Sequence, residues 1–144
     1  MVSENKPLKV YVAGKFEKKL IVLNLYERLK SMGHEISYDW TNHIEIKPYS
    51  ENVRLATTYS DSELEGISNS DVFIYLSDNE GTTLKMEVGA AIMAKMITGS
   101  PKQIYIVGEY NDKSPWFMNE KFVKRLDNID DVIKDIERYA DASR

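Results

Sequence analysis

The chain has 144 residues, of which 42% are apolar and 29% are charged, the balance of a globular domain with its own hydrophobic core. Its formal net charge of −4 argues against a protein that binds mainly nucleic-acid phosphates or anionic lipid. The absence of cysteine excludes disulfides, thiolate metal sites and a cysteine nucleophile, and the presence of only two histidines argues against a Ser–His–Asp triad or a multi-histidine metal site.

The first half of the chain predicts two strand–helix units. Residues 8–13 are a short apolar run that stops at Gly14, and residues 16–32 follow as an amphipathic helix. Residues 35–38 predict a second short strand. Segment 39–57 has little periodicity, and an irregular stretch of that length in a compact domain is often functional. Residues 59–69 predict a helix with Leu64 and Ile67 facing the core.

The second half predicts three further strands. Residues 71–76 form the strongest one, a continuous apolar run that is typical of a parallel strand buried on both faces. A polar turn, 77–82, leads into a helix over 83–97, for which Thr83 is a candidate N-cap. Residues 103–107 and, more weakly, 122–126 predict strands, and 128–139 predict a terminal helix.

Strands that alternate with helices predict a single-domain α/β fold over residues 1–144, a Rossmann-like or flavodoxin-like three-layer sandwich. Ligands in such folds bind beyond the carboxyl ends of the strands. The sequence therefore places a site among residues 13–16, 39–41, 77–82 and 108–119. The N-terminal residues contain no long apolar stretch, so we expect no signal peptide, no membrane span and a cytoplasmic location.

The turn after the first strand, Ala13-Gly14-Lys15-Phe16, lacks the markers of four common uses of this fold. It has neither the dinucleotide fingerprint G-x-G-x-x-G nor the spacing of a Walker A loop. It is rich in lysine, whereas a flavodoxin phosphate loop is rich in serine, threonine and glycine. The acidic pair that a phosphoacceptor receiver domain needs after its first strand is also absent.

A group of acids stands around the central strand instead. Glu63 lies on the helix before it, Asp78 and Glu80 lie in the turn after it, and Glu87 lies early in the next helix. Paired carboxylates at a strand-end cleft suit general acid or nucleophilic chemistry at a sugar carbon. The alternative for Glu87 is an ordinary acid that interacts favourably with the helix dipole.

Four segments in this order resemble the nucleoside 2-deoxyribosyltransferase family, which includes the nucleoside 5′-monophosphate N-glycosidases. They are Val10-Tyr11-Val12-Ala13-Gly14-Lys15-Phe16, Glu63-Leu64-Glu65-Gly66-Ile67, Asp71-Val72, and Gly81-Thr82 with Met86-Glu87-Val88-Gly89-Ala90-Ala91. The resemblance spans about residues 8–136. It implies a five-stranded parallel sheet and cleavage of the N-glycosidic bond of a (deoxy)nucleoside or its monophosphate.

By this resemblance Glu87 matches the glutamate that attacks the anomeric carbon, and Tyr11 matches the tyrosine that orients it. Glu63 stands where transferases carry an aspartate near the sugar, and Glu80 or Asp78 lies near the acid that handles the base. The other residues expected to bind substrate are Gly14, Lys15, Phe16, Gly81, Thr82, Gly89 and Asn119. In the family, the segment that holds Asn119 crosses from a neighbouring subunit, so we expect a homodimer or a higher homo-oligomer.

Three readings stay open. The first is an enzyme that transfers or hydrolyses the glycosyl group with Glu87 as the nucleophile, without metal or cofactor, on a small-molecule nucleoside or nucleotide. The second is a non-catalytic nucleotide-binding module on the same scaffold, and the third is an interaction protein whose helices build an oligomer. The glutamate at position 63 and the lysine-rich first loop depart from the family pattern. They leave open whether the enzyme is a transferase or a hydrolase, and whether its substrate is a nucleoside or a nucleoside monophosphate.

Overall fold

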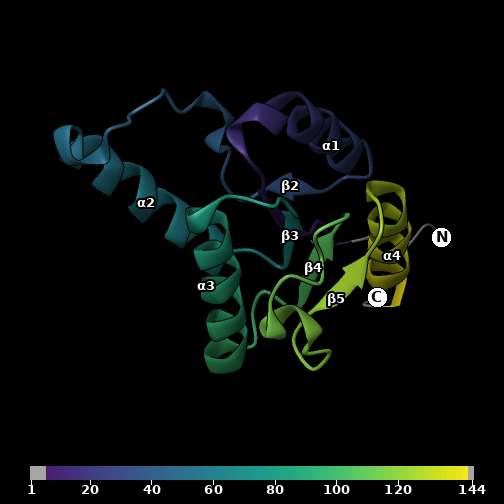
Figure 1. Ribbon diagram of the computed structural model, residues 1–144. Helices are drawn as coiled ribbons and strands as arrows, with labels where there is room; N and C mark the ends of the chain where they lie inside the picture. Colours follow the sequence, from purple (N-terminus) through teal and green to yellow (C-terminus); the bar gives the residue numbers. More distant parts are fainter. Residues whose placement is uncertain (1–5, 143–144) are drawn as a thin grey trace.

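Five short strands form one all-parallel sheet in the computed structural model, which describes residues 6–142 (Figure 1). The order across the sheet is β2-β1-β3-β4-β5, the flavodoxin-like doubly wound order. The strands are β1 (Lys9–Ala13), β2 (Glu35–Ile36), β3 (Val72–Leu76), β4 (Gln103–Val107) and β5 (Lys124–Leu126). The prediction of an α/β three-layer fold with a five-stranded parallel sheet is confirmed.

Helices cover both faces of this sheet, with α1 and α4 on one face and α2 and α3 on the other (Figure 1). The four helices are α1 (Lys19–Ser31), α2 (Val53–Ser68), α3 (Thr82–Thr98) and α4 (Ile129–Ala142). Four short 3-10 helices lie in the connections: η1 (Phe16–Lys18), η2 (Trp40–Asn42), η3 (Tyr49–Glu51) and η4 (Pro115–Met118). None of the helices within residues 6–142 is long and apolar enough to cross a membrane.

The two central strands are the most buried part of the core. All five residues of β3 are buried, and so are the last four residues of β1. Because helices cover both faces, neither strand alternates between apolar and polar residues. The chain order reverses between β1 and β3, and ligands bind beyond the carboxyl ends of the strands at such a switch point.

Three predictions about the helices are corrected by the structure. Helix α2 begins at Val53 rather than at residue 59, so the predicted irregular segment 39–57 contains η2, η3 and the start of a helix. Leu64 does not face the core, because its side chain is 54% exposed, whereas Ile67 is buried as predicted. The N-cap of α3 is Gly81, whose φ of +99° suits glycine, and Thr83 lies inside the helix.

The remaining boundaries differ by small amounts. The predicted helix over 16–32 divides into η1 and α1, and the two weakest strands, β2 and β5, are shorter than predicted. The first five residues, on which the expectation of no signal peptide partly depends, lie outside the described residues.

Candidate active site

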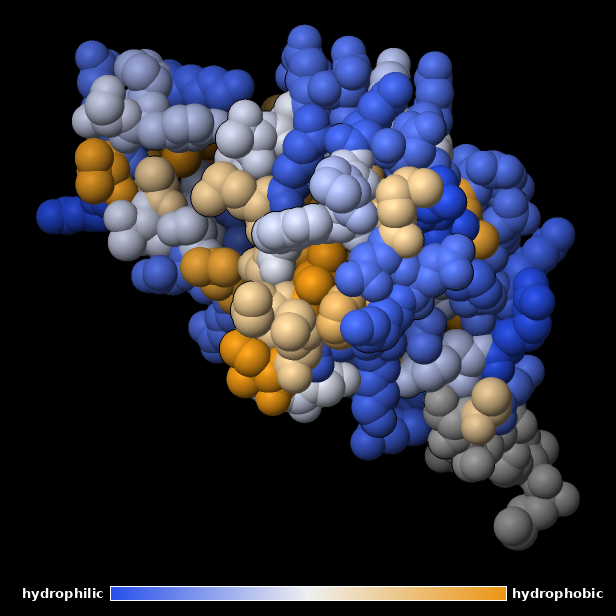
Figure 2. All heavy atoms as spheres, turned by 60° about the horizontal axis from the view of Figure 1, so that its bottom comes forward, coloured by the Kyte–Doolittle hydropathy of each residue, from blue (hydrophilic) through white to orange (hydrophobic). Residues whose placement is uncertain are grey.

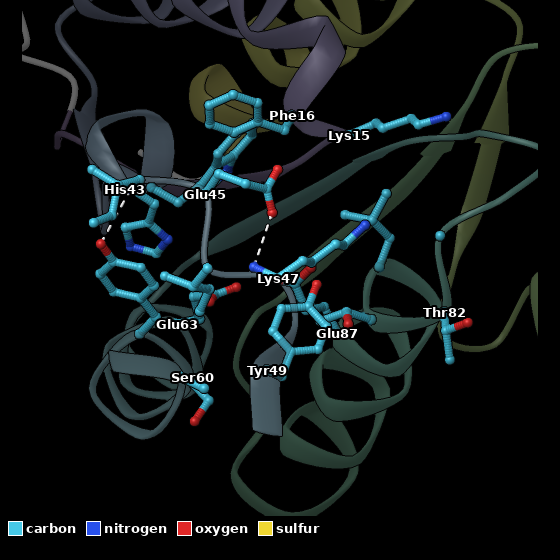
Figure 3. A pocket seen from close by; sticks show the side chains of 18 of the residues that line it. Lys15, Phe16, His43, Glu45, Lys47, Tyr49, Ser60, Glu63, Thr82 and Glu87 are labelled. Atoms are coloured by element: carbon cyan, nitrogen blue, oxygen red, sulfur yellow. Dashed lines mark hydrogen bonds between the residues drawn. The ribbon is translucent and has the colours of Figure 1, made fainter. Parts of the chain in front are cut away.

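A pocket of about 930 Å³ opens at the carboxyl ends of β1 and β3 (Figure 3). Its walls come from the turn after β1, the connection between β2 and α2, one side of α2 and the first turns of α3. Eight residues that the sequence predicted for the site line this pocket: Gly14, Lys15, Phe16, Glu63, Glu80, Gly81, Thr82 and Glu87. The topology thus gathers residues from four separate segments of the chain.

Glu87 lies at the bottom of the pocket, in the second turn of α3, and is only 7% exposed. The hydroxyl of Tyr11 donates a hydrogen bond of 2.6 Å to Glu87 Oε1. Tyr11 is fully buried in β1, and its ring stacks on Phe73 of β3 with the ring centroids 5.6 Å apart. The sheet therefore holds the donor in place, and the donor fixes the orientation of the carboxyl group.

Glu63 places a second carboxyl group near that of Glu87. It projects from α2 toward the same hollow as Glu87 (Figure 3), and each of the two carboxyl groups shifts the pKa of the other. Gly66, one turn further along α2, makes this approach possible. A Cβ atom at Gly66 would lie 2.6 Å from the Cβ of Tyr38 and 3.3 Å from the ring of Tyr11. A larger residue there would push α2 away from the floor of the pocket.

The protonation of this pair follows from its burial. Burial raises the pKa of Glu87 to about 8, the Tyr11 hydrogen bond lowers it, and the charge and hydrogen bond of Glu63 raise it. Burial also raises the pKa of Glu63, which its hydrogen bond to Glu87 opposes. Because both pKa values are raised and that of Glu87 reaches about 8, the pair keeps a proton near neutral pH, and the two groups titrate as a unit.

The Tyr11 hydroxyl stays protonated throughout, because its burial and then the charge of Glu87 raise its pKa far above the ordinary value. Its proton is therefore always available to Glu87. When the proton of the pair lies on Glu63, Glu87 is a buried carboxylate with a fixed donor and an acid beside it, which are the parts of a nucleophile and its acid partner.

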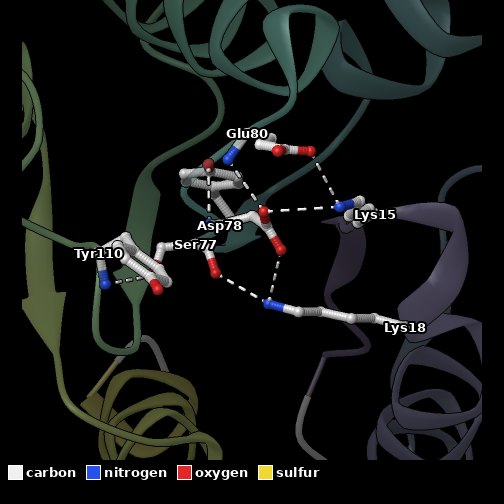
Figure 4. Close-up of polar contacts among 7 residues, drawn as sticks. Lys15, Lys18, Ser77, Asp78, Glu80 and Tyr110 are labelled. Atoms are coloured by element: carbon white, nitrogen blue, oxygen red, sulfur yellow. Dashed lines mark hydrogen bonds and ion pairs between the residues drawn. The ribbon is translucent and has the colours of Figure 1, made fainter.

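The loops after β1 and β3 are joined by ion pairs above this floor (Figure 4). Lys18 Nζ lies 3.4 Å from Asp78 Oδ2 and donates a 2.9 Å hydrogen bond to the Ser77 carbonyl oxygen. Lys15 Nζ lies 3.9 Å from Asp78 Oδ1 and 3.5 Å from Glu80 Oε2. The Glu80 backbone N–H and then the two lysines lower the pKa of Asp78, which holds this carboxylate charged.

Four predicted residues do not line the pocket. Tyr11 is one of them, because it is fully buried in β1 and contacts Glu87 from within the core. The side chain of Asp78 is engaged by the lysines, and Gly89 faces Trp116, whose ring would lie 3.2 Å from a Cβ atom at that position. Asn119 is exposed just after η4, where its side chain accepts from the Lys121 N–H. Its predicted role in the site of a neighbouring subunit stays a prediction.

The opposite wall contains aromatic residues that are not among the substrate-binding residues predicted from the sequence. Trp40 is buried and donates from Nε1 to the Val12 carbonyl oxygen over 2.6 Å, which ties the start of the β2–α2 connection to β1. His43 stacks on Tyr59 with the ring centroids 3.7 Å apart. Tyr49 stands at the rim (Figure 3). The strand-end rule indicated residues 39–41, and the irregular length indicated the segment 39–57, but neither signal indicated an aromatic wall.

The site offers no ready set of metal ligands. Across residues 6–142, no three or more histidine, aspartate or glutamate side chains are grouped so that they could hold a metal ion. Burial lowers the pKa of His43, so this imidazole is neutral at neutral pH.

One face of α3 is apolar although it is exposed. Its large apolar side chains, each more than half exposed, are Met86, Met93, Met96 and Ile97. Trp116 of η4, which is 61% exposed, lies against the same helix at Gly89. In Figure 2, which turns the bottom of Figure 1 forward, orange and cream side chains gather at the centre of the surface. We call Met86, Met93, Met96, Ile97 and Trp116 together the α3 face.

The sequence matches no protein-family model and no curated protein. Among solved structures, the fold is similar to that of the CMP N-glycosidase BcmB from Clostridium botulinum. The TM-score is 0.57 and the sequence identity is 18%, with 91% of this chain and 99% of that chain covered. At this identity the similarity establishes the shared three-layer α/β fold.

Proposed function

We propose that the chain is a nucleoside 2-deoxyribosyltransferase-like domain that cleaves or transfers at the N-glycosidic bond of a nucleoside or nucleotide, with Glu87 as the nucleophile. The observation that carries the proposal is the group at the switch point of the sheet formed by the buried Tyr11 and Glu87 and the half-buried Glu63. The fold neighbour BcmB, a CMP N-glycosidase, supports the same bond as the target.

In the first step, the Glu87 carboxylate attacks the anomeric carbon and the bond between this carbon and the base nitrogen breaks. The bonding electron pair leaves with the base, which takes up the proton that Glu63 holds. Tyr11 donates to Glu87 throughout and keeps the attacking oxygen aimed. The product of this step is a glycosyl ester on Glu87 and a free base.

In the second step, water or an acceptor base attacks the same carbon, the ester bond breaks, and its electron pair returns to the Glu87 carboxylate. The attacking water or acceptor base gives its proton to Glu63, which restores the starting state. Two displacements at one carbon retain the configuration of the sugar. Access of water or of a second base to the pocket then decides between hydrolysis and transfer.

We also propose that the α3 face binds a second copy of this chain. Helices that are apolar all round are normally buried, and α3 is apolar on its inner and its outer side. The exposed parts of the five side chains amount to roughly 600 Å², compared with about 800 Å² per partner in a standard interface. Closed twofold dimers pair the same patch on both subunits.

The test is chromatographic detection of free base. The protein is incubated with a panel of ribonucleosides, deoxynucleosides and 5′-monophosphates, with and without an acceptor base, beside Glu87→Gln. We expect base release by the unaltered protein alone, and a requirement for acceptor would identify a transferase. No release from any substrate by a folded protein would refute the proposal, and melting shifts with the same ligands would then identify a binding module.

A further inference from the structure

The pocket carries an excess of negative charge. Its lining includes five glutamates, Glu17, Glu45, Glu63, Glu80 and Glu87, and two lysines, Lys15 and Lys47. Even with one proton shared between Glu63 and Glu87, the lining stays about two charges negative. A ligand that enters this pocket therefore meets a field that repels anions.

Two of the three lysines at the β1–α1 turn, Lys15 and Lys18, are already paired with carboxylates, and the third, Lys19, lies over the Phe16 ring, 5.7 Å from its centroid. This turn lies at the switch point, where doubly wound folds commonly bind a ligand phosphate. Lys18 does not line the pocket, because its ammonium group points to the Ser77 carbonyl oxygen and Asp78. Lys15 lies between the carboxylates of Asp78 and Glu80 (Figure 4). A phosphate at this turn would face both carboxylates.

Lys47 does not offset the negative charge of the pocket lining. It lies in the β2–α2 connection, on a different wall from the turn after β1, and it is exposed to solvent. Its single charge faces a lining in which glutamates outnumber lysines.

We propose that the pocket selects a nucleoside without a 5′-phosphate, and that Asp78 and Glu80 exclude the monophosphate. This inference rests on the proposed function and narrows its substrate class. It distinguishes the chain from the fold neighbour, which is a CMP N-glycosidase. The uncharged sugar and base avoid the repulsion that a phosphate dianion would meet next to the two carboxylates.

The experiment compares kcat/KM for matched pairs, cytidine with CMP, adenosine with AMP, and the corresponding deoxy pairs, by base release. We expect each nucleoside to exceed its monophosphate by about tenfold or more, the effect of one to two nearby charges on a dianion. Glu80→Gln and Asp78→Asn should each raise the monophosphate-to-nucleoside ratio by about tenfold. Glu137→Gln, which removes the same charge from α4, should leave the ratio unchanged.

A preference for the monophosphates, or a ratio that neither carboxylate variant changes, would overturn the inference while leaving the proposed function intact. If no substrate releases base, the proposed function fails and the selectivity is read from melting temperatures with the same pairs. Stabilisation by nucleosides alone would support the charge argument. Stabilisation by monophosphates, or by neither ligand, would overturn it.

Discussion

Replacement of Tyr11 by phenylalanine removes one hydroxyl from the floor of the pocket. The ring remains, so its burial in β1 and its stacking on Phe73 should preserve the fold. The lost group donates a 2.6 Å hydrogen bond to Glu87 Oε1. Hydrogen bonds to charged groups contribute about 1.5–3 kcal/mol. Because one pKa unit corresponds to about 1.4 kcal/mol, the pKa of Glu87 should rise by about one to two units.

The assay is the pH dependence of kcat/KM for base release. The active state has Glu87 ionised and the one remaining proton of the pair on Glu63, so activity should fall as the pair loses this proton through the pKa of about 8. In Tyr11→Phe this fall should move to higher pH by about one to two units, and because the proton then prefers Glu87, activity at pH 7 should be about 10- to 100-fold lower. An unmoved or lower alkaline limb would refute the reasoning.

Glu63→Gln provides the matched control with the opposite sign. The charge of Glu63 and its hydrogen bond both raise the pKa of Glu87, so their loss should move the ionisation of Glu87 to lower pH. The same variant also loses the proton donor for the departing base, so its maximal rate should fall and the alkaline limb of the pair should disappear. Two substitutions in one pocket that move the ionisation of Glu87 in opposite directions are not explained by general damage to the fold.

Three further predictions concern stability and assembly. Between about pH 4.5 and pH 8 Glu87 binds more protons in the folded state than in the unfolded state, because its pKa is raised on folding, so its contribution to the free energy of unfolding should fall across this window. In denaturant titrations the free energy of unfolding of the unaltered protein should therefore fall relative to that of Glu87→Gln as the pH rises. The buried Tyr26 hydroxyl has no hydrogen-bond partner among residues 6–142, so Tyr26→Phe should raise Tm by about 2–4 °C, and a lower Tm in calorimetry would show that the hydroxyl is satisfied. Met93→Lys should convert the dimer to a monomer in light scattering. The control Leu20→Lys changes an exposed apolar residue of α1 outside the α3 face and should leave the dimer intact. A monomeric unaltered protein would contradict the assembly proposal.

The sheet could be predicted from the sequence because its signal is strong and local. The continuous apolar run over 71–76 corresponds to β3, which is buried throughout, and the run over 103–107 matches β4 in both bounds. Helices on both faces leave such strands no polar side, so length and composition alone identify them.

Helix α2 shows where the pattern fails and why. Its first residues, from Val53 onward, extend away from the body of the molecule, so they carry no apolar periodicity (Figure 1). Further along, the side that faces the core holds Glu63, Gly66 and Ile67 rather than Leu64 and Ile67. A half-buried carboxyl group and a glycine take the positions where apolar side chains would reveal the buried face.

The candidate site was predictable in part. The strand-end rule and the family resemblance indicated Glu87, Glu63 and Tyr11, and the structure places them in contact. The contact between Tyr11 and Glu87 joins residues 76 positions apart, so no local pattern contains it. The aromatic wall formed by Trp40 and His43 depends on how an irregular connection folds back over β1, which periodicity does not describe.

The most direct test of Glu87 as a nucleophile is the configuration of the sugar product. Base release from a β-nucleoside is carried out with methanol as acceptor, and the methyl glycoside is examined by proton NMR. Two displacements through a glycosyl ester on Glu87 predict the β-glycoside. The α-glycoside would indicate a single displacement by the acceptor and would contradict the account.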